Sequence, residues 1–270
     1  INISNDIIDN YGTINFNNVN SYTTTRGDDL QNHENATTTI NDSTLELNSK
    51  IINDSVMNIN NTTINGYNGT LINNSGKTLN MDKSTAYITV NNSGIYNSNK
   101  SSYTRSFSNN SGGVFVSKTD NYTTDISNSG QLDLYDVTTT SGKSMSNNNS
   151  GVINMYSGTI NTYVYNSNTS TLNIYDGTIV SRIANRNQAI VNFIGGTMIN
   201  TGSDSIVNEG TGTINIGTKD GTVNLDSPTI TTNAIGVTNN ANGKLNFYDG
   251  KITGSTAISG PVTEIEDGYD

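Results

Sequence analysis

Hydrophobic residues recur along this chain in short alternating groups and not in long runs. The stretch TLNIYDGTI, residues 171–179, shows the pattern. In an extended strand Leu172 and Ile174 point one way, while Asn173 and Tyr175 point the other way. A turn-forming Asp-Gly pair follows, and Ile179 then returns to the apolar side. Alternation with a period of two residues, without an apolar stripe of period 3.6, predicts short β-strands separated by tight turns.

The same phrase returns at a nearly constant interval. Asn-Ser-Gly triplets end at Gly76, Gly94, Gly112 and Gly130, each 18 residues apart, and again at Gly151. Copies of the phrase then begin at Val152, Thr171 and Ile190, each 19 residues apart, and later at Thr213 and Lys244. Such a period predicts a solenoid, either a leucine-rich repeat or a parallel β-helix. The chain contains only ten leucines, which excludes the first.

We therefore predict an all-β fold, a right-handed single-stranded parallel β-helix of about a dozen coils of 18–23 residues. Three stacks of inward residues are expected. The first contains Leu132, Ile153, Leu172, Val191, Ile214 and Leu245. The second contains Leu134, Met155, Ile174, Phe193, Ile216 and Phe247. The third contains Val137, Ile160, Ile179, Met198, Val223 and Ile252. Asparagines at equivalent corners are expected to form side-chain amide ladders.

The repeats are expected to form one continuous domain. Residues 1–36 are predicted to form irregular N-terminal coils or a cap, and residues 37–260 the β-helix repeats, with an insertion within 217–243. Residues 261–270 are expected to form an acidic C-terminal tail or cap that covers the last open strand edge. The chain has neither an initiator Met nor a signal peptide, so we expect it to be part of a longer protein.

Composition narrows the function classes. Only 31% of the residues are hydrophobic, and about one residue in six is Asn, so only a narrow core can be filled. The absence of Cys excludes disulfides and thiolate metal sites. A net charge of −10, with the 13 Lys and Arg residues scattered, argues against nucleic acid as a partner. No apolar run is long enough to predict membrane insertion by this segment.

Tandem coils that combine Asn-Ser-Gly with LNIYDGTI-like phrases resemble the repeats of large bacterial surface proteins. Such surface proteins form the adhesin-like, pectate-lyase-like β-helix group. The passenger domains of autotransporters have similar sequences. The resemblance covers about residues 56–260 and is clearest over 131–260. It implies an extracellular location at the bacterial cell surface and a role in cell adhesion. The match includes no catalytic motif, so no catalytic residue is carried over.

Outward tyrosines at one position of successive coils are the candidate ligand-binding residues, because exposed aromatic rings can bind sugar faces. The candidate set is Tyr135, Tyr156, Tyr175 and Tyr248, together with the neighbouring amides of Asn154 and Asn173. The alternative is that the rings only pair across strands, which contributes roughly 0.2–1 kcal/mol per pair. The expected partner is a glycan or a host surface protein.

Carboxylates and arginines offer a second kind of site. Asp176 and Asp249, with Asp136 equivalent, lie in the turn of the phrase, where sister copies have Ser157 and Gly195; this exchange is typical of a turn residue. Arg182 and Arg186 with Asp176 suggest a polysaccharide-lyase groove, but such chemistry needs several carboxylates on one face, and here they are spread out.

Three further features are interpreted as structural. Arg26-Gly27-Asp28 is a receptor-recognition tripeptide in a polar loop, but nothing else in the chain supports a receptor. His33, the only His, is expected at the surface. The outward threonines Thr159, Thr178 and Thr197 suggest an ice-binding array, against which the variable coil length argues.

The sequence thus predicts a structural and adhesive segment of a bacterial cell-surface protein. It would act as a rigid rod that presents polar and tyrosine-bearing faces to host or cell-surface ligands, without enzymatic activity, cofactor or metal. The alternatives are a carbohydrate-active β-helix enzyme, a polysaccharide lyase or hydrolase, and a passive stalk spacer without a ligand.

Overall fold

The computed structural model describes residues 2–4, 8–19, 21–23, 28–47, 49–219, 227–240 and 242–265. Within these residues the protein is all-β, without a helix, and its parallel sheets stack as a β-solenoid of about 13 turns, which confirms the predicted fold class. The chain divides into two compact units, Ile1–Leu132 and Asp133–Asp270, which are described separately. Arg26, Gly27 and Val223 lie outside the described residues.

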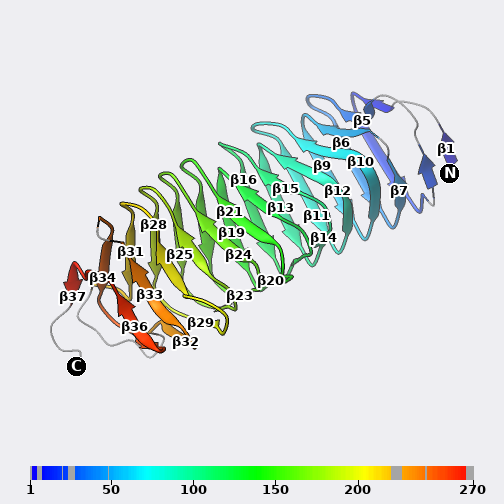
Figure 1. Ribbon diagram of the computed structural model, residues 1–270. Helices are drawn as coiled ribbons and strands as arrows, with labels where there is room; N and C mark the ends of the chain where they lie inside the picture. Colours follow the sequence, from blue (N-terminus) through cyan, green and yellow to red (C-terminus); the bar gives the residue numbers. More distant parts are fainter. Residues whose placement is uncertain are drawn as a thin grey trace. The chain divides into compact units, whose positions relative to one another are not determined.

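Strands of the first unit pair in parallel with the equivalent strands of the next coil (Figure 1). One column contains β3, β6, β9, β11, β13 and β16, which belong to the 13-stranded sheet. The other strands up to β18 belong to the 24-stranded sheet. The strands are β1 (Asn2–Ser4), β2 (Ile8–Asn10), β3 (Thr13–Asn17), β4 (Ser21–Thr23), β5 (Asp28–Asn32), β6 (Thr37–Asn41), β7 (Thr44–Glu46), β8 (Lys50–Asn53), β9 (Val56–Asn60), β10 (Thr63–Asn73), β11 (Thr78–Asp82), β12 (Thr85–Asn92), β13 (Ile95–Asn99), β14 (Ser102–Tyr103), β15 (Phe107–Asn109), β16 (Val114–Lys118), β17 (Asn121–Tyr122) and β18 (Ile126–Asn128). Strand β19 (Gln131–Tyr135) contains the boundary between the units.

The second unit has three columns of parallel strands, β22–β25–β28–β31–β34–β37, β20–β23–β26–β29–β32–β35 and β21–β24–β27–β30–β33–β36. Its strands are β20 (Val137–Thr139), β21 (Ser144–Asn147), β22 (Val152–Met155), β23 (Gly158–Ile160), β24 (Tyr163–Asn166), β25 (Thr171–Ile174), β26 (Thr178–Ile179), β27 (Ile183–Asn185), β28 (Ile190–Phe193), β29 (Thr197–Asn200), β30 (Ile206–Asn208), β31 (Thr213–Ile216), β32 (Thr229–Thr232), β33 (Ile235–Asn239), β34 (Lys244–Phe247), β35 (Lys251–Thr253), β36 (Thr256–Ser259) and β37 (Glu264–Ile265). Each coil of this unit therefore presents three strand faces around one core.

Register in the second unit confirms the first two predicted stacks from Ile153 and Met155 onward and corrects the third. Ile153, Leu172, Val191, Ile214 and Leu245 pair in succession, and so do Met155, Ile174, Phe193, Ile216 and Phe247. In the third stack Ile160, Ile179, Met198, Ile230 and Ile252 align.

Two members of the predicted third stack were wrong. Val137 pairs with Gly158 and not with Ile160, because the coils stay aligned residue for residue after Tyr135 and Tyr156. Ile230 pairs with Met198 and takes the position assigned to Val223.

A ladder of buried asparagines runs through each unit and confirms the expected amide ladders. Its members are at most 3% exposed, and each Nδ2 donates to the Oδ1 of the next asparagine at 2.8–3.1 Å. The first unit contains Asn10, Asn32, Asn53, Asn73, Asn92, Asn109 and Asn128, and the second contains Asn147, Asn166, Asn185, Asn208 and Asn239. The Nδ2 group also donates to a backbone carbonyl of the next coil, as Asn166 does to Ile190 at 2.8 Å. These amides thus satisfy the polar backbone of a corner that the core has closed off from water.

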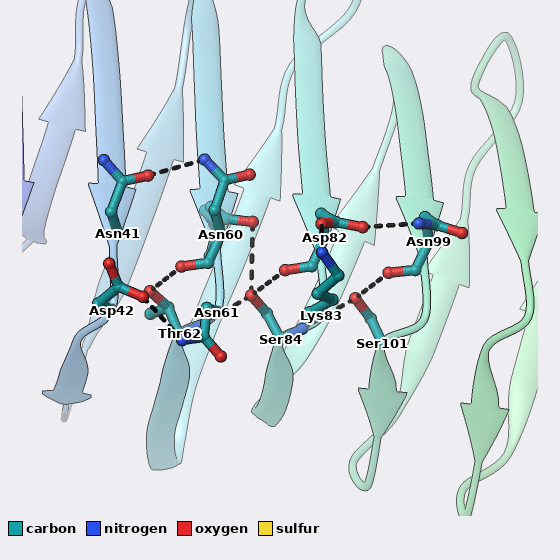
Figure 2. A network of polar contacts seen from close by, with 11 residues as sticks. Asn41, Asp42, Asn60, Asn61, Thr62, Asp82, Lys83, Ser84, Asn99 and Ser101 are labelled. Atoms are coloured by element: carbon teal, nitrogen blue, oxygen red, sulfur yellow. Dashed lines mark hydrogen bonds and ion pairs between the residues drawn. The ribbon is translucent and has the colours of Figure 1, made fainter.

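A second buried ladder, built from hydroxyls, closes another corner of the first unit (Figure 2). Each member accepts the backbone N–H of the equivalent residue in the preceding coil at 2.7–3.4 Å. The members are Ser43, Thr62, Ser84, Ser101 and finally Asp120. Each hydroxyl donates to the carbonyl two residues before it, at 2.6–3.0 Å. The residue before each member has a positive φ of 46–55°, in Asp42, Asn61, Lys83, Lys100 and Thr119. The ladder therefore holds a left-handed corner even where Lys or Thr occupies it.

Asp120 ends this ladder inside the core of the first unit. It is 1% exposed; its Oδ1 accepts the Ser101 N–H and its Oδ2 accepts the Ser117 hydroxyl, both at 2.7 Å. Burial raises the pKa of its carboxyl to about 6, against an ordinary value of 3.8. Beside it lies a cluster of fully buried rings, Tyr96, Tyr103, Phe107, Phe115 and Tyr122, with neighbouring centroids 4.4–6.3 Å apart. Aliphatic and aromatic side chains thus surround the Asp120 carboxyl in this part of the core.

Candidate functional site

Three outward tyrosines of the second unit stack in register. The centroids of the Tyr135 and Tyr156 rings lie 4.6 Å apart with an interplanar angle of 6°, and those of Tyr156 and Tyr175 lie 5.0 Å apart with an angle of 5°. The backbone sets this geometry, because the N–H groups of Tyr156 and Tyr175 donate to carbonyls of the preceding coil at 2.9 and 2.8 Å. The coil repeat therefore orders the row before any ligand arrives.

Stacking changes which part of each ring a ligand can reach. Neighbouring rings cover each other's facing sides, so a ligand meets the ring edges along the row. Tyr175, at one end of the row, is 40% exposed. Burial between its neighbours, with the charge of Asp133 next in importance, raises the pKa of Tyr156 above its ordinary value. The Tyr156 hydroxyl is therefore a protonated donor at neutral pH.

An outward amide ladder runs beside the tyrosines and includes both predicted asparagines. Each Nδ2 donates to the preceding coil at 2.7–2.8 Å, from Asn246 through Asn215, Asn192, Asn173 and Asn154 to the carboxylate of Asp133. Asn154 and Asn173 are thus both donors and acceptors within the protein. A ligand can bind only through hydrogen-bonding capacity that the ladder leaves unused. These amides are therefore mainly a scaffold for the tyrosine row.

Tyr248 lies apart from the other predicted tyrosines. Ile194 and Gly217 occupy the equivalent position in the two coils between it and Tyr175. Its hydroxyl donates to Glu264 at 3.3 Å, and the Lys219 ammonium lies 5.7 Å from its ring centroid. The structure thus brings together five of the six predicted binding residues and places Tyr248 in a separate polar cluster.

The Asp-Gly corners have the bonds of turns. Asp176 Oδ1 accepts the N–H of Gly177, and Asp249 Oδ1 accepts that of Gly250, both at 2.6 Å. Gly177 and Gly250 have φ values of 104° and 118°, which disfavour any residue with a Cβ. At the equivalent corner, Ser157 accepts the N–H of Asp136 at 2.9 Å. The carboxylates therefore hold tight corners.

Arg182 and Arg186 lie with Glu209 and two tyrosines, an arrangement that sequence reasoning missed. Arg182 Nη2 donates to Glu209 Oε1 and Arg186 Nε donates to Glu209 Oε2, each at 2.7 Å. The Arg186 guanidinium carbon lies 4.6 Å from the Tyr165 ring centroid, and the Tyr165 and Tyr163 rings are 6.4 Å apart. A signal was present, since Arg186 and Glu209 each follow a ladder asparagine, Asn185 and Asn208.

Two other features have local explanations. The His33 ring stacks on Tyr11, with centroids 4.0 Å apart, and its Nε2 lies 2.8 Å from Asp9. The outward threonines Thr138, Thr159, Thr178, Thr197 and Thr229 align in register although the coils differ in length, because the extra residues lie between strands.

No family model, curated protein or solved structure matches this chain. In the part of the chain that the structure describes, no helix is long and apolar enough to cross a membrane. The same residues contain no group of three or more His, Cys, Asp or Glu side chains placed to hold a metal ion.

Proposed function

We propose that this chain is a structural and adhesive segment of an extracellular, bacterial cell-surface protein. In this proposal the row formed by Tyr135, Tyr156 and Tyr175 binds a glycan or a protein on a host or cell surface. The observation that carries it is the in-register stacking of these three outward rings on a scaffold of amide ladders. A ring row ordered in advance loses little conformational entropy when a ligand binds, which favours recognition by weak, repeated contacts.

Replacing Tyr156 or Tyr175 by Ala is expected to weaken ligand binding about tenfold, because each substitution removes one phenol ring from the row. Tyr156→Ala also leaves a gap between the two remaining rings. Binding to a glycan array and to cell-surface extracts measures the effect. Tyr87→Ala is the matched control, because Tyr87 has a comparable exposure of 45% but lies on the first unit.

Two results would contradict the proposal. Absence of binding, or binding unchanged by both stack substitutions, would favour a passive spacer. Polysaccharide turnover that is lost on substitution of Asp176, Arg182 or Arg186 would favour a carbohydrate-active enzyme.

A further inference from the structure

We propose that Tyr163, Tyr165, Arg182 and Arg186 form a second ligand site, which binds the carboxylate or sulfate group of an acidic sugar. This acidic-sugar site lies on the column β24–β27–β30, a different strand face from the tyrosine stack. The inference rests on the proposed adhesive function, for which it names a ligand class, but it depends on different residues and can fail separately.

The surroundings of Arg186 leave one edge of its guanidinium available. Glu209 occupies Nε at 2.7 Å, and the Tyr165 ring lies against the guanidinium plane at 4.6 Å. The remaining edge carries Nη1 and Nη2, which have no partner among the described residues, and the side chain is 45% exposed. This edge matches the two oxygens of a carboxylate or sulfate, which a guanidinium can bind through parallel hydrogen bonds. The Tyr165 ring and Glu209 hold the fork in place before binding.

The charge of the cluster favours an anion. Arg182 and Arg186 share the single carboxylate of Glu209, so the group carries a net charge of +1 in a chain of net charge −10. Arg182 Nε is buried without a hydrogen-bond partner, and so is the hydroxyl of Ser205, which lies beside Arg182 in the strand register. An N–H that no acceptor neutralises adds to the positive potential at the site, because a bonded acceptor would offset its partial charge.

The neighbouring rings favour a sugar as the carrier of the anionic group. Tyr163 is 46% exposed and stands next to Tyr165, so a pyranose ring attached to the anion at Arg186 would meet an aromatic surface. A nucleic acid would need a longer row of cations to follow its phosphates, and the Lys and Arg residues of this chain are scattered. The geometry therefore fits one acidic sugar within an oligosaccharide.

Binding of a glucuronate-containing oligosaccharide and of the same oligosaccharide after carboxyl reduction tests the site. A sulfated neutral oligosaccharide and its desulfated form provide the second arm. We expect the unmodified protein to bind at least one anionic form about tenfold more tightly than its neutral counterpart, with affinity falling as salt rises. Arg186→Gln is expected to lose roughly ten- to a hundredfold in affinity.

Arg105→Gln is the matched control. Arg105 also stacks on a tyrosine, with its guanidinium carbon 4.0 Å from the Tyr67 ring centroid. It lies on the first unit, whose described residues contain no second arginine. Circular dichroism and thermal unfolding check that each variant folds. Equal binding of charged and neutral forms, or an unchanged affinity in folded Arg186→Gln, would overturn the inference. Acidic-sugar binding that Tyr156→Ala abolishes and Arg186→Gln does not would assign the ligand to the tyrosine stack instead.

Discussion

Asn166→Ala is expected to lower the free energy of unfolding by about 3–5 kcal/mol, because each buried polar group left without its partner costs about 1–3 kcal/mol. The Asn166 amide donates to Asn185 Oδ1 at 3.0 Å and to the Ile190 carbonyl at 2.8 Å. Its Oδ1 accepts from Asn147 Nδ2 at 2.9 Å and from the Ser170 hydroxyl at 2.7 Å. Alanine would leave several of these groups buried with too few partners and would also create a small cavity.

Asn173→Ala is the matched control for this substitution. Asn173 makes the same kind of ladder bonds, at 2.8 Å to Asn154 and 2.7 Å from Asn192, but it lies on the partly exposed outer face. Water can replace its bonds, so we expect a loss of only about 0.5–1 kcal/mol. Urea unfolding followed by circular dichroism measures both. Equal losses in the two variants would show that the hydrogen bonds, and not their burial, set the cost.

The inner ladder also explains how a chain so poor in hydrophobic residues folds. Its buried asparagines, at most 3% exposed, occupy core positions that an aliphatic residue would usually fill. Each amide bonds to the next coil, so the stabilisation grows with the number of coils, as expected for a repeat protein. Asn richness, which in isolation suggests disorder, is here part of the repeat.

The stacks of the second unit could be predicted because a parallel repeat puts equal positions in contact. Leu172 and Ile174 pair with Val191 and Phe193 for that reason alone. Val137 resembles Ile160 in type, but strand pairing follows the residue count from Tyr135 and places Val137 beside Gly158. The amide ladders could be expected from recurring Asn, but the sequence did not show which ladder is buried, since inward and corner positions contain the same residue type.

The candidate site was only partly predictable, because side-chain length decides which residues meet across coils. Tyr135, Tyr156 and Tyr175 share one position and stack, as equal spacing implies. The long side chains of Arg182 and Arg186 instead reach Glu209 in the next coil. They do not pair with Asp176, although Asp176 is nearer in the sequence. Asp120 gave no signal as a core residue, because charged residues are rarely buried without a partner.

The stability contributed by Asp120 is expected to fall as the pH rises from about 4 to above 6. Its pKa is raised to about 6 in the folded protein from 3.8, so in this interval the folded state holds a proton that the unfolded state has released. The difference between these two pKa values corresponds to about 3 kcal/mol of stability, which is present in full below pH 4 and lost above pH 6. Burial is the main cause of the raised pKa of Asp120. The hydrogen bonds from Ser117 and Ser101 lower this pKa, and the charge of Asp82 raises it further.

Asp120→Asn separates the pH-dependent contribution of Asp120 from those of all other carboxylates of the chain. Asn keeps an oxygen for the Ser101 N–H, while its amide N–H groups can donate to the Ser117 hydroxyl, which also contacts the Tyr122 hydroxyl at 2.7 Å. The burial of Tyr96, Tyr103 and Tyr122 raises their pKa values further above neutrality, so these neighbours do not titrate in the same interval. We expect the difference in unfolding free energy between Asp120→Asn and the unmodified protein to shift by about 3 kcal/mol in favour of the variant from pH 4 to pH 7. A difference that is the same at both pH values would show that Asp120 keeps an ordinary pKa in the folded core, because water reaches its carboxylate there.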